Sequence, residues 1–249
     1  MRVYLAGANK EQLNTLDKKI YVLESFAYMQ KHKESINLLL NNNFLLDSGA
    51  FTFIGKKNKD LINWEEYTNS YVDFINTHNI DLFFELDVYS VIGNDKTEAL
   101  RNKIEQKTGK QSIPVWHIFL GIDYWKKLCE EYKYIAIGAS GKNDSKWTRT
   151  NPEQLKALVL YAKSKGVKVH GLGYTVLNQL YQIPFHSVDS TTWLNASKYG
   201  ELQYFNGRNI KKVQAKNIGK KTIKEKSKEM LLNNFNQWIL FQEYAINNL

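Results

Sequence analysis

Acidic residues end several short apolar stretches of this chain, and they are the first candidates for chemistry. Asp47 ends the stretch Phe-Leu-Leu-Asp, and Asp189 ends Phe-His-Ser-Val-Asp. A carboxylate on an apolar strand is costly unless it is paired or hydrogen-bonded, so its presence favours a site that uses it. Two carboxylates facing one substrate atom permit a double displacement at a sugar carbon. One acts as nucleophile and the other as general acid and then base.

The same types of side chain allow a second kind of site. Carboxylates and imidazoles bind divalent cations, so a metal-dependent hydrolase is an alternative. Its candidate ligands are Asp47, Glu85, Asp87 and His170. A zinc site built from several thiolates is excluded, because Cys129 is the only cysteine of the chain. The residue types by themselves leave both kinds of chemistry open.

Strand-like stretches of β-branched and aromatic residues alternate along the chain with segments of helical periodicity. The pattern predicts eight strands, at residues 3–6, 44–47, 82–87, 115–119, 134–138, 167–171, 185–189 and 203–206. It predicts helices between them, among others at 64–77, 95–106, 124–131 and 152–164. This alternation predicts an α/β fold, a (β/α)8 TIM-like barrel with a basic C-terminal extension, and an open doubly wound sheet is the alternative.

A barrel would bring the ends of these strands to one rim, where active sites are built. Besides Asp47 and Asp189, the expected strand ends carry further polar residues and glycines. They are Glu85, Asp87, His117, Gly138, Ala139, His170 and Gly171. We therefore expect one site at this rim.

The 249 residues, 43% of them hydrophobic, are enough to bury a full core, which excludes a disordered tail. We expect a catalytic barrel over residues 1–207 and a second part, 208–249, with a basic segment and a C-terminal helix packed on the barrel. No apolar stretch approaches the roughly 18 residues of a membrane span. We therefore expect a cytoplasmic protein with no membrane partner.

Positive charge is concentrated near the end of the chain. The formal net charge is +9, and residues 208–228 contain nine basic residues opposed only by Glu225. Such a segment indicates contact with the phosphates of a nucleic acid. A basic and aromatic cluster after the fifth strand is expected to contact the backbone of the same nucleic acid. The candidate nucleic-acid-binding residues are Lys146, Trp147, Arg149, Arg208, Lys211, Lys212, Lys220 and Lys221. The alternatives are a solvated helix face, or a barrel that binds nucleic acid without catalysis.

Four segments, in this order, resemble the tRNA-guanine transglycosylases. Residues 47–52 (DSGAFT) resemble the family's DSGGFQ, and residues 134–140 (YIAIGAS) resemble IGGLAVGE. Residues 170–175 (HGLGYT) are similar to MGVGTP, and residues 187–196 (SVDSTTWLNA) stand where the family has FDCVLPTRNA. Overall the chain looks like the short DpdA-like branch, which is associated with inserting 7-deazaguanines into DNA, often in phages.

The resemblance implies a role for each matching residue. Asp189 would attack C1′ of a deoxyguanosine and form a covalent intermediate, with Asp47 as general acid and base. Asp87 would read the Watson–Crick edge of the base. Further substrate contacts fall on His117, Gly138, Ala139, His170, Gly171 and Tyr174, with a main-chain N–H near Gly138 on O6 and Tyr174 stacked on the base.

The implied function is base exchange in DNA, in which a free 7-deazaguanine replaces guanine without a cofactor or a metal. The same chemistry on tRNA is the alternative. The chain departs from the family in three places. It lacks the family's cysteine-rich zinc site, it has Ala50 for the second glycine of DSGGFQ, and its nucleophile segment reads DSTTW. These departures argue against tRNA as the substrate more than against the base-exchange chemistry.

Overall fold

The computed structural model describes residues 1–53, 62–139, 142–194, 200–214 and 220–249, except for the side chains of residues 142–143, 214 and 220–226. Its centre is a sheet of seven parallel strands in the order β3-β2-β1-β7-β6-β5-β4. The strands are β1 (Arg2–Ala6), β2 (Tyr21–Ser25), β3 (Asn43–Asp47), β4 (Val115–Trp116), β5 (Tyr134–Gly138), β6 (Lys168–Leu172) and β7 (Ser187–Ser190).

Two isolated bridges connect the outer strands of this sheet. Leu46 of β3 pairs with Phe83, and Phe84 pairs with Ile113 just before β4, each time in the parallel sense. The segment around Phe83 therefore occupies the eighth position between β3 and β4. The sheet is curled into a TIM-like barrel, as predicted, and it is not an open doubly wound sheet.

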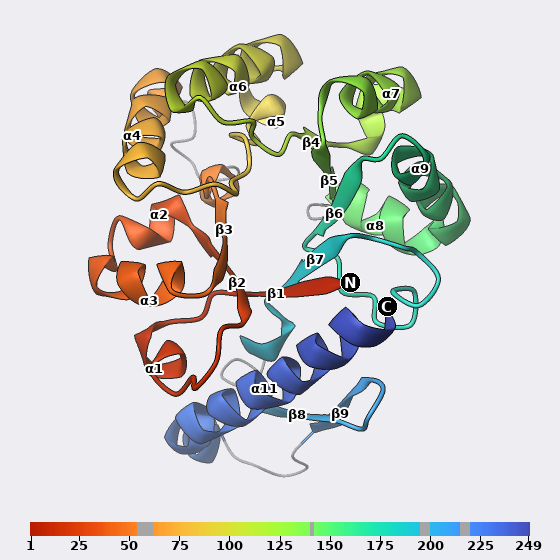
Figure 1. Ribbon diagram of the computed structural model, residues 1–249. Helices are drawn as coiled ribbons and strands as arrows, with labels where there is room; N and C mark the ends of the chain where they lie inside the picture. Colours follow the sequence, from red (N-terminus) through yellow and green to blue (C-terminus); the bar gives the residue numbers. More distant parts are fainter. Residues whose placement is uncertain (54–61, 140–141, 195–199, 215–219) are drawn as a thin grey trace.

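Helices surround the strands on the outside (Figure 1). They are α1 (Lys10–Leu13), α2 (Phe26–Met29), α3 (Ile36–Leu40), α4 (Trp64–Thr77), α5 (Tyr89–Ile92), α6 (Asn94–Thr108), α7 (Gly121–Glu131), α8 (Lys142–Thr150) and α9 (Pro152–Ser164). Short 3-10 turns lie at η1 (Lys33–Ser35), η2 (Ala50–Thr52), η4 (Ile118–Leu120) and η5 (Thr192–Leu194). The helices predicted at 64–77 and 152–164 are confirmed to the residue. Local signals explain this accuracy, because Asn63 caps α4 by accepting from the N–H of Glu66, and Pro152 opens α9.

The strand prediction extended β4 too far, since residues 118–120 form η4, and it was wrong for two further strands. It omitted β2, whose sequence Tyr-Val-Leu-Glu-Ser contains a carboxylate and leads directly into α2. It also placed the stretch 203–206 in the barrel, whereas β8 (Glu201–Phe205) pairs antiparallel with β9 (Ile210–Gln214) in a separate hairpin. A short strand with alternating side chains has the same sequence pattern in either sheet.

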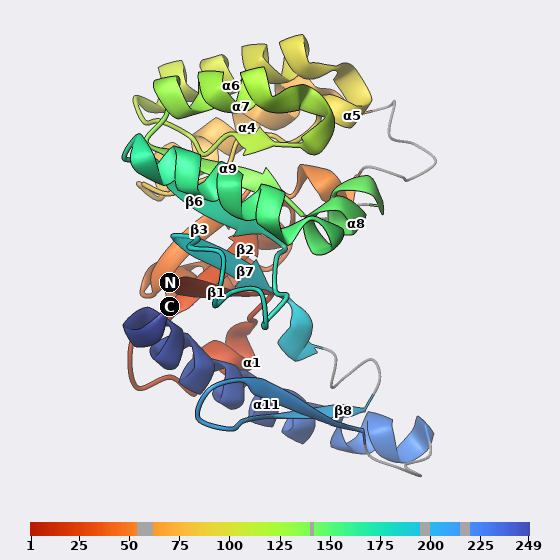
Figure 2. The same cartoon turned by 90° about the vertical axis from the view of Figure 1, so that its right-hand side faces the viewer.

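The last helix, α11 (Lys220–Asn248), lies beside β1 and the hairpin, at one side of the barrel (Figure 2). Phe235, Trp238 and Phe241 are buried on the face that meets them. Gln242 donates to the carbonyl oxygens of Val3 (2.6 Å) and Tyr21 (2.9 Å) and accepts from the Tyr21 N–H (2.9 Å). The helix is therefore bound to the barrel by backbone contacts as well as by apolar ones. In the described part of the chain, no helix has the length and apolarity to cross a membrane.

Side chains alternate between the inside and the outside of the barrel, as the strand period requires. Tyr4, Leu23, Leu45, Val115 and Ala136 belong to the inner cluster. Asp47 follows Leu45 by two residues on β3, and Asp189 follows Ser187 by two residues on β7. Both carboxylates therefore also point inward. The C-terminal end of the barrel therefore receives polar side chains where its middle is mostly apolar.

Candidate acid/base site

A cavity of about 410 Å³ lies at the C-terminal ends of β1, β2, β3, β6 and β7. Its lining is formed by Ala6, Gly7, Leu23, Glu24, Ser25, Asp47, Ser48, Phe51, Thr52, Asp87, Leu172, Gly173, Asp189 and Thr191. Four of these are acids, and none of the described lining residues is a lysine or an arginine. This is the end at which barrel enzymes hold their substrates.

Asp47 stands at the end of β3, in the tight turn that precedes η2. The Gly49 N–H donates to its Oδ2 at 3.1 Å. Gly49 has a φ of 71°, and a Cβ there would lie 2.6 Å from the Cβ of Ala27, so the turn requires glycine. Burial raises the pKa of Asp47 to about 7, and the negative charges of Asp189 and Asp87 act in the same direction against the Gly49 hydrogen bond. Asp47 therefore holds or releases a proton near neutral pH.

Asp189 faces the same cavity as Asp47, from β7, and two groups contact its carboxylate. The Gly173 N–H donates to Asp189 Oδ1 at 2.5 Å, and His170 Nε2 lies 3.2 Å from the same oxygen. The Asp189 side chain is only 9% exposed.

His117 lies between two carboxylates at the neighbouring strand end. Its Nε2 is 3.0 Å from Asp87 Oδ1, and its Nδ1 is 3.2 Å from Asp144 Oδ2. Burial lowers the pKa of His117, but the two carboxylates outweigh it and raise the pKa to about 9. The imidazole is therefore charged at neutral pH. Gly138 makes room for it, because a Cβ there would lie 2.4 Å from His117 Cε1.

Two acids of this region were not predicted from the sequence. Asp144, on α8, fixes His117 and also accepts from the Ile118 N–H at 3.2 Å. Glu24, on the omitted strand β2, accepts from the Ser25 N–H, and its Oε2 is buried without a hydrogen-bond partner among the described residues. Burial, and less strongly the charge of Asp47, raises the pKa of Glu24 to about 7. The signal for Glu24 was a carboxylate inside Tyr-Val-Leu-Glu, whereas Asp144 gave none.

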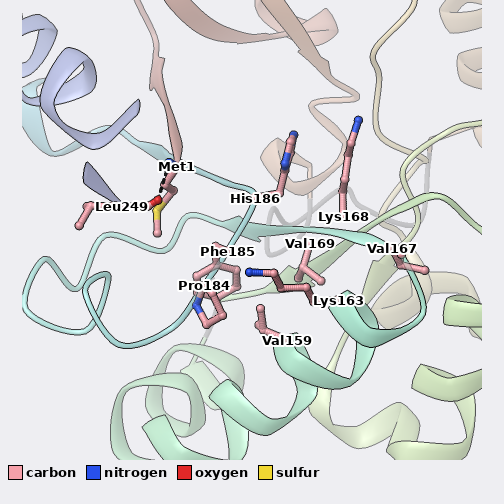
Figure 3. A pocket seen from close by; sticks show the side chains of 11 residues that line it. Met1, Val159, Lys163, Val167, Lys168, Val169, Pro184, Phe185, His186 and Leu249 are labelled. Carbon is pink, nitrogen blue, oxygen red and sulfur yellow. Dashed lines mark hydrogen bonds between the residues drawn. The ribbon is translucent and has the colours of Figure 1, made fainter. Parts of the chain in front are cut away.

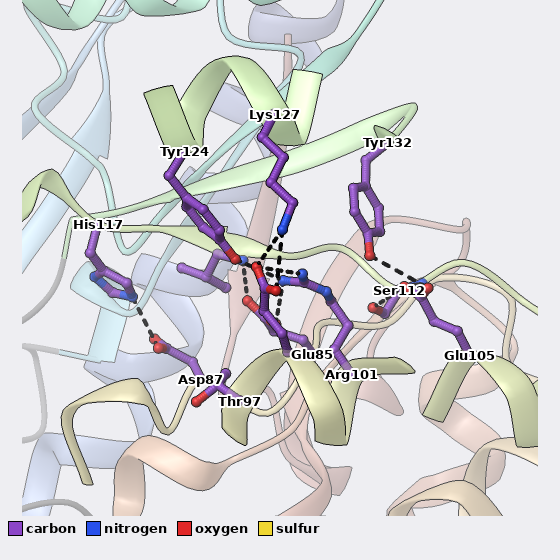
Figure 4. Close-up of polar contacts among 12 residues, drawn as sticks. Glu85, Asp87, Thr97, Arg101, Glu105, Ser112, His117, Tyr124, Lys127 and Tyr132 are labelled. Carbon is purple, nitrogen blue, oxygen red and sulfur yellow. Dashed lines mark hydrogen bonds and ion pairs between the residues drawn. The ribbon is translucent and has the colours of Figure 1, made fainter. Parts of the chain in front are cut away.

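Glu85 lies on the other side of the sheet. It points to Arg101, whereas Asp87 points to His117 (Figure 4). Arg101 Nη1 donates to Glu85 Oε2 at 3.1 Å, and the Val115 N–H donates to Oε1 at 2.6 Å. Both side chains are 3% exposed. Glu85 thus fastens the irregular strand around Phe83 to β4 and α6, and it does not reach the cavity.

This placement separates the proposed metal ligands. Glu85 lies outside the barrel, and His170 lies inside it below Asp189. Among the described residues, no group of three or more histidine, cysteine, aspartate or glutamate side chains has an arrangement that could hold a metal ion. The expected set of Asp47, Glu85, Asp87 and His170 does not come together.

Other expected substrate contacts are engaged within the protein. The Ala139 N–H donates to the Leu172 carbonyl at 3.0 Å. Tyr174 is 2% exposed, donates to Gln179 and contacts Phe185. Gly171 packs against Tyr174 and Val188, because a Cβ added at Gly171 would lie 3.0 Å from Tyr174 Cβ and 3.2 Å from Val188 Cγ1. None of these three residues lines the cavity.

The expected nucleic-acid-binding residues lie on separate elements. Lys146 and Arg149 are exposed on α8, where Trp147 is half-buried against Trp116. Arg208 lies over the Tyr181 ring at 4.9 Å, Lys211 is exposed, and Lys212 pairs with Glu201 at 3.2 Å. The side chains of Lys220 and Lys221 lie outside the described ones. A nucleic-acid partner stays a prediction.

A second cavity, of about 360 Å³, lies at the opposite, N-terminal ends of β6 and β7 (Figure 3). It is lined by Met1, Val159, Lys163, Gly166, Val167, Lys168, Val169, Pro184, Phe185, His186 and Leu249. Burial lowers the pKa of His186 to about 4, so this imidazole is neutral. The described lining has no carboxylate side chain, and this end of a barrel serves stability rather than catalysis.

No family model matches the chain. No curated protein matches it either. Among solved structures, the chain is similar to the putative copper homeostasis protein CutC from Streptococcus agalactiae, a TIM barrel. The TM-score is 0.48 and the sequence identity 14%, over 77% of this chain and 99% of that chain.

This comparison corrects the family assignment. The similar structure belongs to a different family from the tRNA-guanine transglycosylases and their DpdA-like branch. The predicted exchange of guanine for a 7-deazaguanine in DNA is therefore wrong, and the alternatives on tRNA or with a metal gain no support. The four short motifs coincide with strand ends and their turns, which many barrels share.

Proposed function

We propose that the chain is an enzyme that cleaves a glycosidic bond, with Asp47 as general acid and Asp189 as the ionised partner. The observation that carries the proposal is the unequal environment of two carboxyl groups in one cavity. Burial and neighbouring charges raise the pKa of Asp47 to about 7, whereas Asp189 accepts a hydrogen bond from the Gly173 N–H and lies within hydrogen-bond distance of His170 Nε2. Pairs whose environments differ in this way divide the roles of acid and base.

The charge of the cavity supports a glycosidic substrate. Cleavage of such a bond passes through an oxocarbenium-like transition state, which carries positive charge. Carboxylates stabilise that charge, whereas they oppose an enolate, an oxyanion or a transferring phosphoryl group. Because no described lining residue is a lysine or arginine, the reacting part of the substrate is expected to be uncharged or cationic.

In the proposed reaction, Asp47 donates its proton to the departing atom as the bond to the anomeric carbon breaks. Asp189 stabilises the positive carbon or bonds to it, and Asp47 then takes a proton from the incoming water. His117 and Asp87 form an ion pair at the edge of the cavity. This pair restricts where the substrate lies.

The test uses the full chain with p-nitrophenyl glycosides of the common pentoses and hexoses, and with the four ribonucleosides. We expect release of p-nitrophenol or free base from at least one of them, reduced at least about 100-fold by Asp47→Asn and by Asp189→Asn. Asp81→Asn is the matched control, because Asp81 is exposed at the other end of the barrel. Equal activity in all variants, or no cleavage of any probe, would contradict the proposal.

A further inference from the structure

A column of four polar side chains lies inside the barrel and ends at the cavity. Tyr134 Oη is 2.5 Å from Ser187 Oγ, which is 2.5 Å from His170 Nδ1. His170 Nε2 is 3.2 Å from Asp189 Oδ1. Ser187 and His170 are 0% exposed. Barrel interiors are usually filled with branched apolar side chains, so a buried polar column is stable only when each member is hydrogen-bonded.

With a neutral His170 and an ionised Asp189, the hydrogens of this column have one consistent direction. An ionised Asp189 only accepts, so His170 Nε2 must carry the hydrogen that lies between them. In a neutral imidazole, Nδ1 is then an acceptor, and Ser187 donates to it. Ser187 in turn accepts from Tyr134, whose phenol stays protonated because burial raises its pKa above the ordinary value. Every donor points toward Asp189.

The opposite direction fails at the cavity. With the hydrogen on Nδ1, the lone pair of Nε2 would face the carboxylate oxygen of Asp189, which also carries lone pairs. That contact is stable only when Asp189 takes up a proton. The tautomer of His170 is thus tied to the ionisation of the carboxylate.

We propose that His170, Ser187 and Tyr134 are positioning residues. Ser187 and Tyr134 hold His170 in the Nε2–H tautomer, and this hydrogen keeps Asp189 ionised and in one orientation. The inference rests on the proposed function, in which Asp189 is the ionised partner. Among the charged groups near this carboxylate, Asp47 faces it across the cavity from β3.

The composition of the column also matches a Ser-His-Asp triad, but its arrangement in space does not. In a triad the serine reaches the substrate and the aspartate stands behind the histidine. Here Asp189 lines the cavity, and Ser187 is buried behind His170 with a second bond to Tyr134. Ser187 therefore acts on Asp189 through His170 and is not a nucleophile.

The experiment reads the ring nitrogens of His170 by ¹⁵N NMR of the full chain and titrates the Asp189 carboxyl by ¹³C NMR. We expect the wild type to show a protonated Nε2 and an unprotonated Nδ1. In Ser187→Ala, the other tautomer becomes populated and the Asp189 titration moves up by about one pH unit. Tyr134→Phe, which leaves Ser187 in place, causes a smaller change in the same direction.

Two variants separate positioning from a general structural effect. Ser190→Ala is the matched control, because Ser190 is a buried serine on the same strand that bonds the Thr192 N–H and does not contact His170. It should leave the nitrogen shifts of His170 unchanged. His170→Gln keeps an N–H donor near Asp189, so its Asp189 titration should stay closer to the wild type than that of His170→Ala.

The proposal is overturned if wild-type His170 carries its hydrogen on Nδ1 or on both nitrogens at neutral pH. It is also overturned if Ser187→Ala folds and leaves the Asp189 titration in place. The wild-type tautomer and Tyr134→Phe decide the question where Ser187→Ala does not fold. These readouts need no substrate, so an absence of glycosidic cleavage would contradict the proposed function and leave this result standing.

Discussion

Asp87 Oδ1 lies 3.0 Å from His117 Nε2, and Asp144 binds the other nitrogen of the same ring at 3.2 Å. An imidazole between two carboxylates accepts a second proton readily, and the pKa of His117 is raised to about 9. The three residues come from different segments at the C-terminal end of the barrel. Their ion pairs thus join the segment after Phe84, the end of β4 and helix α8.

This relationship predicts a pH-dependent stability. The raised pKa means that the contribution of His117 is complete below the ordinary imidazole value of 6.5 and is lost as the pH rises through about 9. Between these values the free energy of unfolding should fall by up to about 3 kcal/mol more in the wild type than in His117→Gln. Urea unfolding at pH 6 and pH 10 measures the difference.

The exposed His32 provides the control for this prediction. Its side chain is 44% exposed, and its contact with Glu34 is 3.5 Å long at the surface. His32→Gln should therefore keep the wild-type dependence on pH. A dependence that is the same in all three proteins would show that the Asp87–His117–Asp144 contact contributes nothing.

Asp47→Asn should stabilise the fold while it removes the proposed general acid. The pKa of Asp47 is raised from 3.8 to about 7, so the unfolded chain releases this proton at a lower pH than the folded protein does, and stability falls as the pH rises through this range. Above pH 7 the asparagine variant should be more stable by about 2–4 kcal/mol, and near pH 3 the two should be equal. Asp81→Asn, at an exposed site, should show no such gain in urea unfolding at the two pH values.

Gly138→Ala should destabilise the protein through His117. The added Cβ would lie 2.4 Å from His117 Cε1 and 2.6 Å from Nδ1, and the carboxylates on both sides prevent the ring from moving away. Overpacking of this kind costs about 1–3 kcal/mol. The double variant with His117→Ala tests the cause, because the cost of the alanine should largely vanish once the ring is gone. An equal cost in both backgrounds would assign the effect to the backbone of β5.

The barrel was predictable from the sequence because its alternation of strands and helices is local and regular. Helices α4 and α9, which follow the cap Asn63 and begin at Pro152, were both predicted to the residue. Strand β2 was missed because it is short and contains Glu24. The stretch after residue 200 has the pattern of a barrel strand, and only its partner β9 shows that it belongs to a hairpin.

The candidate site was predictable in part for the same reason. Asp47, Asp87, His117 and Asp189 follow predicted strands, and the topology of a barrel brings such residues to one end. Glu24 was not predicted because its strand, β2, was missed. Asp144 reaches His117 only because α8 folds over the rim. The sequence could not show which of two nearby acids enters the site. Glu85 is two residues from Asp87 and yet lies on the outer side of the sheet with Arg101.

Gln242 provides a test of how closely the last helix is bound to the barrel. Its amide is 2% exposed and contacts the Val3 carbonyl, the Tyr21 carbonyl and the Tyr21 N–H. Gln242→Ala removes three hydrogen bonds to the backbone of β1 and β2, so the free energy of unfolding should fall by about 2–4 kcal/mol in a single transition. Asn247→Ala, an exposed position on the same helix, should cost less than about 0.5 kcal/mol. If instead Gln242→Ala separates unfolding into two transitions, α11 would be an appendage that unfolds apart from β1 and β2.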